Sequence, residues 1–143
     1  MRLNQATDYA FRIIMELSLM EENQRMTGAE LAERQQVPIR FLLKIMRSLL
    51  QAGLVKSYRG ISGGFVLNKS PKDITLYDVI RTMEPENFFQ RCLTEPNLCT
   101  KHAEGNCAVR HFLMGIAENL QAELTRVNFA EIAEQERRLH QKR

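Results

Sequence analysis

The sequence predicts a mainly α-helical fold with one small β-hairpin. Three observations in the 143 residues support this fold class. Apolar residues recur at helical spacing in several segments of the chain. A glycine-rich turn near residue 62 separates two short runs of β-prone residues. A hydrophobic content of 44% supports one compact core without disulfide staples.

Three helices and the hairpin are predicted in the first half of the chain. Apolar residues over 5–20 recur with a helical period, which predicts an amphipathic first helix. The capping box Thr27-Gly-Ala-Glu30 begins a short second helix that ends near residue 35. Pro38 suits the first turn of a third helix, and Gly53 supplies its end. The hairpin then follows on both sides of the glycine-rich turn.

The third predicted helix has a basic face. Arg40, Lys44 and Arg47 are spaced four and three residues apart, so they form one stripe away from the apolar residues. A short capped helix followed closely by a basic helix is typical of a helix-turn-helix, whose second helix enters the major groove of DNA. With the hairpin, the pattern predicts a winged helix-turn-helix. The predicted DNA-binding residues are Pro38, Arg40, Phe41, Lys44, Arg47, Arg59, Gly60, Ser62 and Gly63.

Positive charge is concentrated around these residues. The formal net charge is only +3, but residues 1–70 carry ten basic and six acidic side chains, whereas residues 71–143 carry ten and eleven. Residues 34–72 contain eight lysines and arginines and no acidic residue. Such a block attracts a phosphate backbone and releases its counterions. The alternative is a solvated basic face without a nucleic-acid partner.

The second half begins with a capping pattern at Thr75–Asp78, which predicts a short helix to about residue 83. A loop of roughly residues 85–107 contains all three cysteines, and a loop of this length is usually functional or disordered. A long amphipathic helix is predicted over 108–127. Asn128 is expected to cap a last helix that runs to about residue 140.

The long helix is expected to form a dimer interface, because a small DNA-binding domain offers little surface to cover its apolar stripe. The alternative is that this helix packs back on the winged helix of its own chain. We therefore divide the chain into a winged helix-turn-helix DNA-binding domain (1–83), a cysteine-containing loop (84–107), and a dimerisation helix with a C-terminal helix (108–143).

The three cysteines, Cys92, Cys99 and Cys107, lie within sixteen residues and have polar neighbours. Clustering in a reducing compartment favours metal or redox chemistry over disulfides. The absence of a Cys-x2-Cys pair weakens a zinc interpretation, whereas three thiolates and a fourth ligand can hold an iron–sulfur cluster. The alternatives are a zinc site, a thiol switch, or cysteines that bind no cofactor. His102 and His111 are the local candidates for the fourth ligand.

Other classes of function find little support. The sequence has no P-loop, no dinucleotide glycine fingerprint, no His-Glu-x-x-His motif and no nucleophile elbow, so we do not expect an enzyme. No apolar run approaches the length of a membrane span, and the N-terminus lacks the apolar core of a signal peptide. A cytoplasmic protein without a membrane partner is expected.

Three motifs together resemble a known family. They are the opening Met-Arg-Leu with Asp-Tyr-Ala at 8–10, the segment over residues 51–67 with its Arg-Gly-Ile-Ser-Gly-Gly wing, and three cysteines before a long helix. They resemble the bacterial regulator family of IscR, NsrR and RirA, over nearly the whole chain. The resemblance implies a homodimeric winged-helix repressor whose operator binding is controlled by an iron–sulfur cluster on the three cysteines.

The resemblance also suggests a fourth ligand and a signal. Asp8 matches the aspartate that the NsrR branch takes from the partner subunit, whereas a histidine after the third cysteine serves the IscR branch. That register holds Arg110 here, with His111 one residue later, so His111 and His102 are the fallback ligands. We expect a 4Fe–4S cluster rather than 2Fe–2S, nitric oxide sensing with iron or redox sensing as the second possibility, and a palindromic operator. The alternative is a cluster-free or zinc-containing regulator switched by thiol oxidation or a protein partner.

Overall fold

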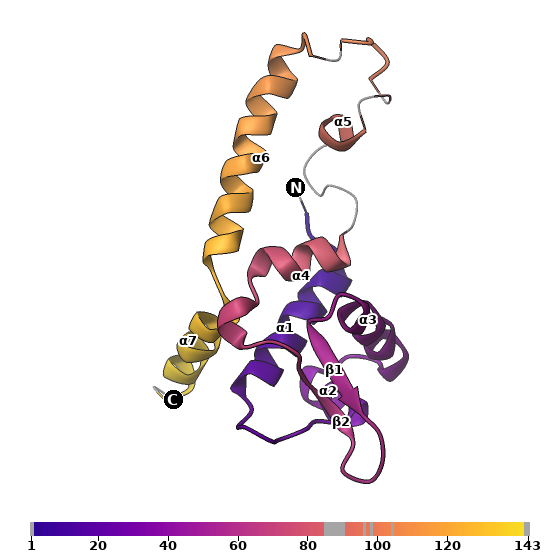
Figure 1. Ribbon diagram of the computed structural model, residues 1–143, viewed down its shortest axis with the longest axis vertical. Coiled ribbons are helices and arrows are strands. Elements are labelled where there is room, and N and C mark those ends of the chain that lie inside the picture. The colour runs from indigo at the N-terminus through magenta and orange to yellow at the C-terminus, as the bar shows by residue number, and fades with distance from the viewer. Residues whose placement is uncertain (1, 85–90, 96, 98, 104, 142–143) are drawn as a thin grey trace.

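The computed structural model describes residues 2–84, 91–95, 97, 99–103 and 105–141. Its helices and strands are α1 (Gln5–Leu19), α2 (Gly28–Gln35), α3 (Ile39–Gln51), β1 (Val55–Tyr58), β2 (Gly64–Leu67), the 3-10 helix η1 (Pro71–Asp73), α4 (Leu76–Met83), α5 (Arg91–Thr94), α6 (Ala108–Arg126) and α7 (Phe129–Gln141). This order confirms the predicted mainly α-helical fold with one hairpin. Figure 1 shows a body built from α1–α4, the hairpin and α7, from which α6 rises.

The core lies between α1 and the helices packed around it. Ala10, Ile13 and Ile14 of α1 are completely buried, and they contact a buried cluster from α3. The members of that cluster from α3 are Leu42, Ile45, Met46 and Leu49. Both predicted apolar stripes are therefore confirmed. Burial of these side chains, at roughly 1.5–3 kcal/mol each, gives the small body most of its stability.

The hairpin is a two-stranded antiparallel sheet in which Val55 pairs with Leu67 and Tyr58 with Gly64. A third segment joins it from the loop between α1 and α2. The Phe65 amide donates to the Met26 carbonyl at 2.8 Å, and the Met26 amide donates to the Phe65 carbonyl at 3.2 Å. These two bonds hold the hairpin against the helical body, as a wing beside the helix-turn-helix.

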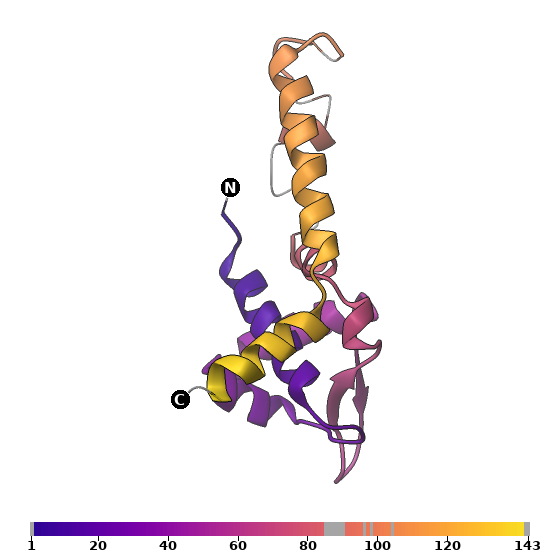
Figure 2. The ribbon, with the colours of Figure 1, turned by 90° about the vertical axis from the view of Figure 1, so that its left-hand side faces the viewer.

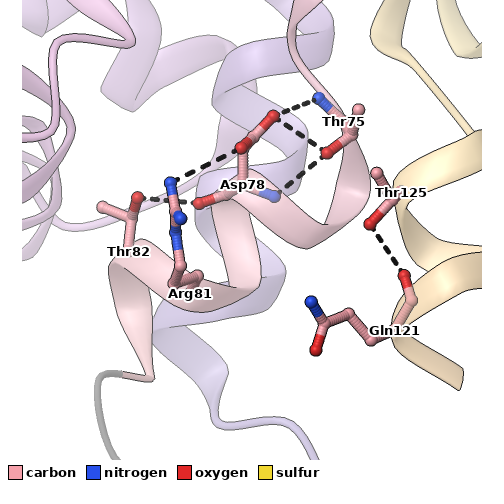
Figure 3. Close-up of polar contacts among 6 residues, drawn as sticks. All are labelled: Thr75, Asp78, Arg81, Thr82, Gln121 and Thr125. Carbon is pink, nitrogen blue, oxygen red and sulfur yellow. Dashed lines mark hydrogen bonds and ion pairs between the residues drawn. The ribbon is translucent and has the colours of Figure 1, made fainter. Parts of the chain in front are cut away.

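The predicted capping pattern before α4 is confirmed (Figure 3). The Thr75 amide and hydroxyl both donate to Asp78 Oδ2 at 2.9 Å, while the Asp78 amide donates to Thr75 Oγ1 at 3.2 Å. The same region receives the lower end of α6. The Leu76 amide donates to the Val127 carbonyl at 3.0 Å, and the Phe129 amide donates to the Ile74 carbonyl at 2.9 Å. The base of α6 is thereby fixed to the start of α4.

The two C-terminal helices behave differently. None of the residues of α6 is buried, and Figures 1 and 2 show it projecting from the body as a single rod. A helix of this length spans about 28 Å. By contrast, α7 turns back and packs on α1, where Phe129 and Ala133 are each 1% exposed. Asn128 Oδ1 accepts the Glu131 amide at 3.1 Å, which confirms the predicted cap.

The cysteine-containing segment leads into the far end of α6. It contains one helical turn, α5, where the sequence predicted only a loop. The predicted loop over 84–107 includes residues 85–90, 96, 98 and 104, which lie outside the described residues. The division of the chain into three units stays a prediction. Among the described residues, no helix is both long and apolar enough to cross a membrane.

Docking of α7 on α1 can be tested by replacing Phe129 with alanine. The ring is 1% exposed and lies 6.5 Å from the Phe11 ring between centroids, so its loss leaves a cavity. We expect a loss of about 3–5 kcal/mol in the free energy of unfolding, measured by urea titration. Leu139→Ala is the control, because Leu139 lies on the same helix but is 53% exposed. Equal effects of the two variants would contradict the packing of α7 on α1.

Candidate nucleic-acid interface and metal centre

Local interactions determine how α2 leads into α3. Thr27 and Glu30 form the predicted capping box at the start of α2, with the Thr27 amide donating to Glu30 Oε2 at 2.7 Å. That backbone hydrogen bond, followed by the one from the Thr27 hydroxyl, lowers the pKa of Glu30. Gln36 ends α2 in the left-handed conformation at φ 52°, and the buried Val37 then anchors the turn. Pro38 follows as the N-cap of α3.

The exposed face of α3 is basic with an aliphatic border. Arg40, Lys44 and Arg47 are exposed, as the predicted helical stripe requires. Beside them Ile39 and Leu43 are 45% and 48% exposed, although both are apolar. Exposed apolar side chains next to basic ones suit a groove in which thymine methyl groups and phosphates are both within reach.

Phe41 takes a different position from the basic residues. It is half-buried and packs edge-to-face on Tyr9 of α1, with 5.7 Å between ring centroids. Pro38, Arg40 and Lys44 complete a shallow hollow around these two rings, together with Gln5. Phe41 therefore links the start of the recognition helix to α1 and still borders the exposed face.

Most of the predicted basic block keeps its charge uncompensated. Arg34 is the exception, because its Nη1 lies 2.8 Å from Glu16 Oε1 of α1. Within the part of the chain that the structure describes, no acidic side chain forms an ion pair with Arg40, Lys44, Arg47 or Arg59. The positive potential of the block is thus concentrated on α3 and the wing, where a phosphate backbone can reach it.

Two glycines of the wing lie where nearby backbone atoms leave no room for a side chain. A Cβ on Gly63 would lie 2.5 Å from the Tyr58 carbonyl oxygen, and the Gly63 amide donates to the Gly60 carbonyl at 3.0 Å. Gly64 has φ 147°, and a Cβ there would lie 2.9 Å from the Met26 backbone. The turn is therefore tight, and it leaves Arg59 and Ser62 exposed at its sides.

Sequence reasoning missed two residues that hold these elements in place. Arg25, in the loop before α2, stacks on the Tyr58 ring and bonds to the wing turn. Glu84, at the end of α4, accepts hydrogen bonds from the Asn4 amide and the Thr7 hydroxyl, each at 2.9 Å. Both are contacts between residues far apart in sequence, so no local spacing indicates them.

The three predicted cysteine ligands lie along the segment that leads into α6. Cys92 is in α5, Cys99 follows it, and Cys107 is the N-cap residue of α6; all three are half-buried. Arg110 Nε donates to the Cys92 carbonyl at 3.2 Å and so ties α5 to the first turn of α6. Among the described residues, no three histidine, cysteine or acidic side chains come together as a metal site. Three thiols suit iron in their chemistry, but one chain does not gather them.

The candidate fourth ligands are all exposed. Asp8 lies in the first turn of α1, where its Oδ2 is 2.6 Å from Arg12 Nη2. His102 and His111 are held through their backbones, since their amides donate to the carbonyls of Cys99 at 3.0 Å and Cys107 at 3.1 Å. The backbone of each histidine is therefore bonded to that of a cysteine, whereas Asp8 lies in α1 of the helical body.

Residues 3–135 match the family model described as Rrf2, iron-dependent transcriptional regulator. The chain belongs to the Rrf2 family. Its architecture of helix-turn-helix, wing and long C-terminal helix is that of a DNA-binding transcriptional regulator, and the expectation that it is not an enzyme is confirmed by the regulators that it resembles.

Curated relatives of this Rrf2-family chain are described as HTH-type transcriptional regulators. An HTH-type transcriptional regulator named YffB from Lactococcus lactis is 30% identical over 138 residues, covering 94% of this chain and 88% of the relative. A second HTH-type regulator, from Aquifex aeolicus, is 37% identical over 82 residues. That match spans 57% of each protein, so it covers little more than half of the relative's length.

Solved structures share the fold of this Rrf2-family chain over most of its length. CymR, the global cysteine regulator of B. subtilis, has a TM-score of 0.75 at 24% identity, with 94% of this chain and 97% of CymR covered. IscR of T. potens has a TM-score of 0.75 at 21% identity, with 94% and 88% covered. These likenesses confirm the winged-helix fold.

The steric role of Gly63 leads to a prediction. Gly63→Ala forces a Cβ against the Tyr58 carbonyl, so the wing turn is expected to distort at a cost of about 1–3 kcal/mol. Faster hydrogen exchange of the hairpin amides measures this loss. Gly115→Ala is the control: it lies in α6 with nothing within 4 Å of the added Cβ, and it should leave hairpin exchange unchanged. Unchanged exchange in Gly63→Ala would contradict the tight turn.

Proposed function

We propose that this Rrf2-family chain is a homodimeric repressor that binds a palindromic operator, with an iron–sulfur cluster controlling that binding. The observation that carries the DNA side is the exposed, uncompensated basic face of α3 beside the wing. Arg40 and Lys44 contact base edges or phosphates in the major groove, with Arg47 on the adjacent backbone. Pro38 and Phe41 border this contact, at the end of α3 that carries Arg40.

The wing adds a second contact. Arg59 reaches a neighbouring groove or phosphate, while Gly60, Ser62 and Gly63 shape the turn that presents it. Each DNA-binding unit then reads one half-site, and two units related by a two-fold axis read a palindrome.

A second copy of the chain is the partner that we propose for α6. Val109, Phe112 and Ile116 are 66%, 72% and 53% exposed along this helix, and none of its residues is buried. Apolar side chains in that number are costly in water, and a two-fold pairing of α6 helices removes them from it. Because α6 is fixed to α4 at its base, pairing through α6 also sets the separation of the two recognition helices.

The cluster proposal rests on donor chemistry. Cys92, Cys99 and Cys107 supply three thiolate ligands within one segment, and the family description as iron-dependent regulators supports iron. For the fourth ligand we take Asp8 of the partner subunit, as the resemblance to the NsrR branch implies, with His111 or His102 as the fallback. When bound, a 4Fe–4S cluster supplies an iron site that responds to nitric oxide, iron supply or redox state.

Asp8 offers a physical route from ligand binding to DNA binding. Its carboxylate forms an exposed ion pair with Arg12 through Oδ2, and a change of partner at this carboxylate costs little because such a pair is weak. The next residue, Tyr9, packs on Phe41 of α3. A change in the first turn of α1 therefore acts directly on the start of the recognition helix.

A second candidate is a cluster-free or zinc-containing regulator switched by thiol oxidation or a protein partner. The observation that favours it is that no three-ligand set is assembled within the described residues. Half-buried thiols that are not held in disulfides can be oxidised.

The DNA contacts predict the effects of single substitutions. Arg59→Ala, Arg40→Ala and Lys44→Ala should each weaken binding to a duplex selected from a random-sequence pool. The loss should be about 1–3 kcal/mol at a base contact, whereas a phosphate contact should lower the salt slope by about one. Gel-shift titration at several salt concentrations separates these cases. Arg137→Ala on α7, an exposed arginine away from the interface, is the control. Binding unchanged by all three substitutions would contradict the interface.

The cluster proposal predicts a coloured protein. Anaerobic purification should give brown protein with about one cluster per subunit, held by the three cysteines and a fourth ligand. Serine at Cys99 or Cys107 should abolish the visible absorbance, and Asp8→Ala should make the cluster more labile to nitric oxide. A colourless protein without iron under these conditions would contradict the proposal, and bound zinc without colour would favour the second candidate. An Asp8→Ala variant with wild-type cluster stability would return the fourth position to His111 or His102.

A further inference from the structure

We propose that Arg25 is a positioning residue for the wing. Its guanidinium carbon lies 3.6 Å from the centroid of the Tyr58 ring. Its Nη1 also donates a hydrogen bond to the Ser62 carbonyl oxygen at 3.0 Å. Arg25, from the loop before α2, therefore contacts both Tyr58, which ends β1, and Ser62, in the turn that follows. The inference rests on the wing contacts of the proposed function.

The wing needs such an anchor because a two-stranded hairpin is marginally stable by itself. The pair of backbone bonds between Met26 and Phe65 anchors the start of β2, on one side of the turn. The turn beyond it is exposed, and Ile61 at its tip has no neighbour that covers it, at 109% relative exposure. Within the described residues, Arg25 is the side chain outside the hairpin that hydrogen-bonds to the turn. Loss of this contact leaves the hairpin held against the helical body on the β2 side of the turn, through Met26 and Phe65.

The geometry suits arginine in particular. A planar guanidinium can stack on an aromatic face and still donate hydrogen bonds in its own plane, which the compact ammonium group of lysine cannot do. A carboxylate would compete with the ring for this cation, but in the described part of the chain no acidic side chain forms an ion pair with Arg25. The Lys56 ammonium is a second and more distant cation–π neighbour of the same ring, at 5.7 Å from its centroid.

Anchoring the tip fixes Arg59 relative to the recognition helix. Arg59 directly follows Tyr58, and Met26, the neighbour of Arg25, leads into α2 of the helix-turn-helix. The stack therefore joins the wing to the same body that carries α3. A wing that is ordered before binding does not have to lose that freedom on the DNA, so it binds more tightly.

The test measures DNA affinity for four variants with the selected duplex: Arg25→Ala, Arg25→Lys, Tyr58→Leu and the double variant Arg25→Ala with Tyr58→Leu. We expect each single variant to weaken binding about 3- to 10-fold, the size of one stacked, hydrogen-bonded cation. The double variant should be no weaker than either single one, because both remove the same contact. The salt slope should stay unchanged. Arg137→Ala, an exposed arginine on α7, is the control for loss of one charge.

A second readout reports wing order without DNA. The Gly63 amide, which donates to Gly60, should exchange faster with solvent in Arg25→Ala and in Arg25→Lys. The Phe65 amide, held by Met26, serves as the internal reference and should keep its exchange rate.

Two results would overturn the proposal. One is wild-type affinity and Gly63 exchange in Arg25→Ala. The other is a set of three observations: Arg25→Lys restores binding, Arg25→Ala lowers the salt slope by about one, and the losses in the double variant multiply. Together these would identify a direct contact between Arg25 and a DNA phosphate. If the wild-type chain binds no duplex, the proposed function fails, and Gly63 exchange alone then decides whether Arg25 holds the wing.

Discussion

Burial of α1 is the constraint on which the rest of the structure depends. Its apolar face is covered by α3 and α4 and also contacts α2, α7 and β2, so nearly every element of the body packs on one helix. Close-packed interiors transmit displacement because they contain few voids that could absorb it. A shift of α1 therefore moves the elements that surround it, and among these is the recognition helix.

The first turn of α1 is where this packing meets the start of the cysteine-containing segment. Glu84 at the end of α4 accepts hydrogen bonds from Asn4 and Thr7, so the chain enters the cysteine-containing segment from a point bonded to α1. One turn further along, Tyr9 packs on Phe41 of α3. Contacts within a single chain thus connect the exit of α4 to the start of the recognition helix, without requiring the long α6 to bend.

The parts that the sequence predicted well are those decided by nearby residues. Capping boxes at Thr27 and Thr75 require partners three residues away, and apolar stripes require only a helical period. The glycine-rich turn of the wing could also be predicted, because a tight turn requires glycine at positions close together in the sequence. The contacts of Arg25, Arg34 and Glu84 could not be predicted in this way, since each partner lies at least 18 residues away. The docking of α7 on α1 depends likewise on where the chain folds back.

In the cysteine-containing segment, the residue types suggest a ligand set although the described residues of one chain do not bring three ligands together. Spacing predicted three thiols in one segment, and the structure holds them near the N-terminal end of α6 while leaving that helix without a buried residue. The uncovered apolar face of α6 and the cysteine-containing segment at its far end therefore lie in the same part of the molecule. In the proposed dimer, pairing of the α6 helices would cover that face. If Asp8 of the partner subunit is also the fourth ligand, sensing and dimerisation would depend on one interface, an arrangement that suits a regulator reading two half-sites.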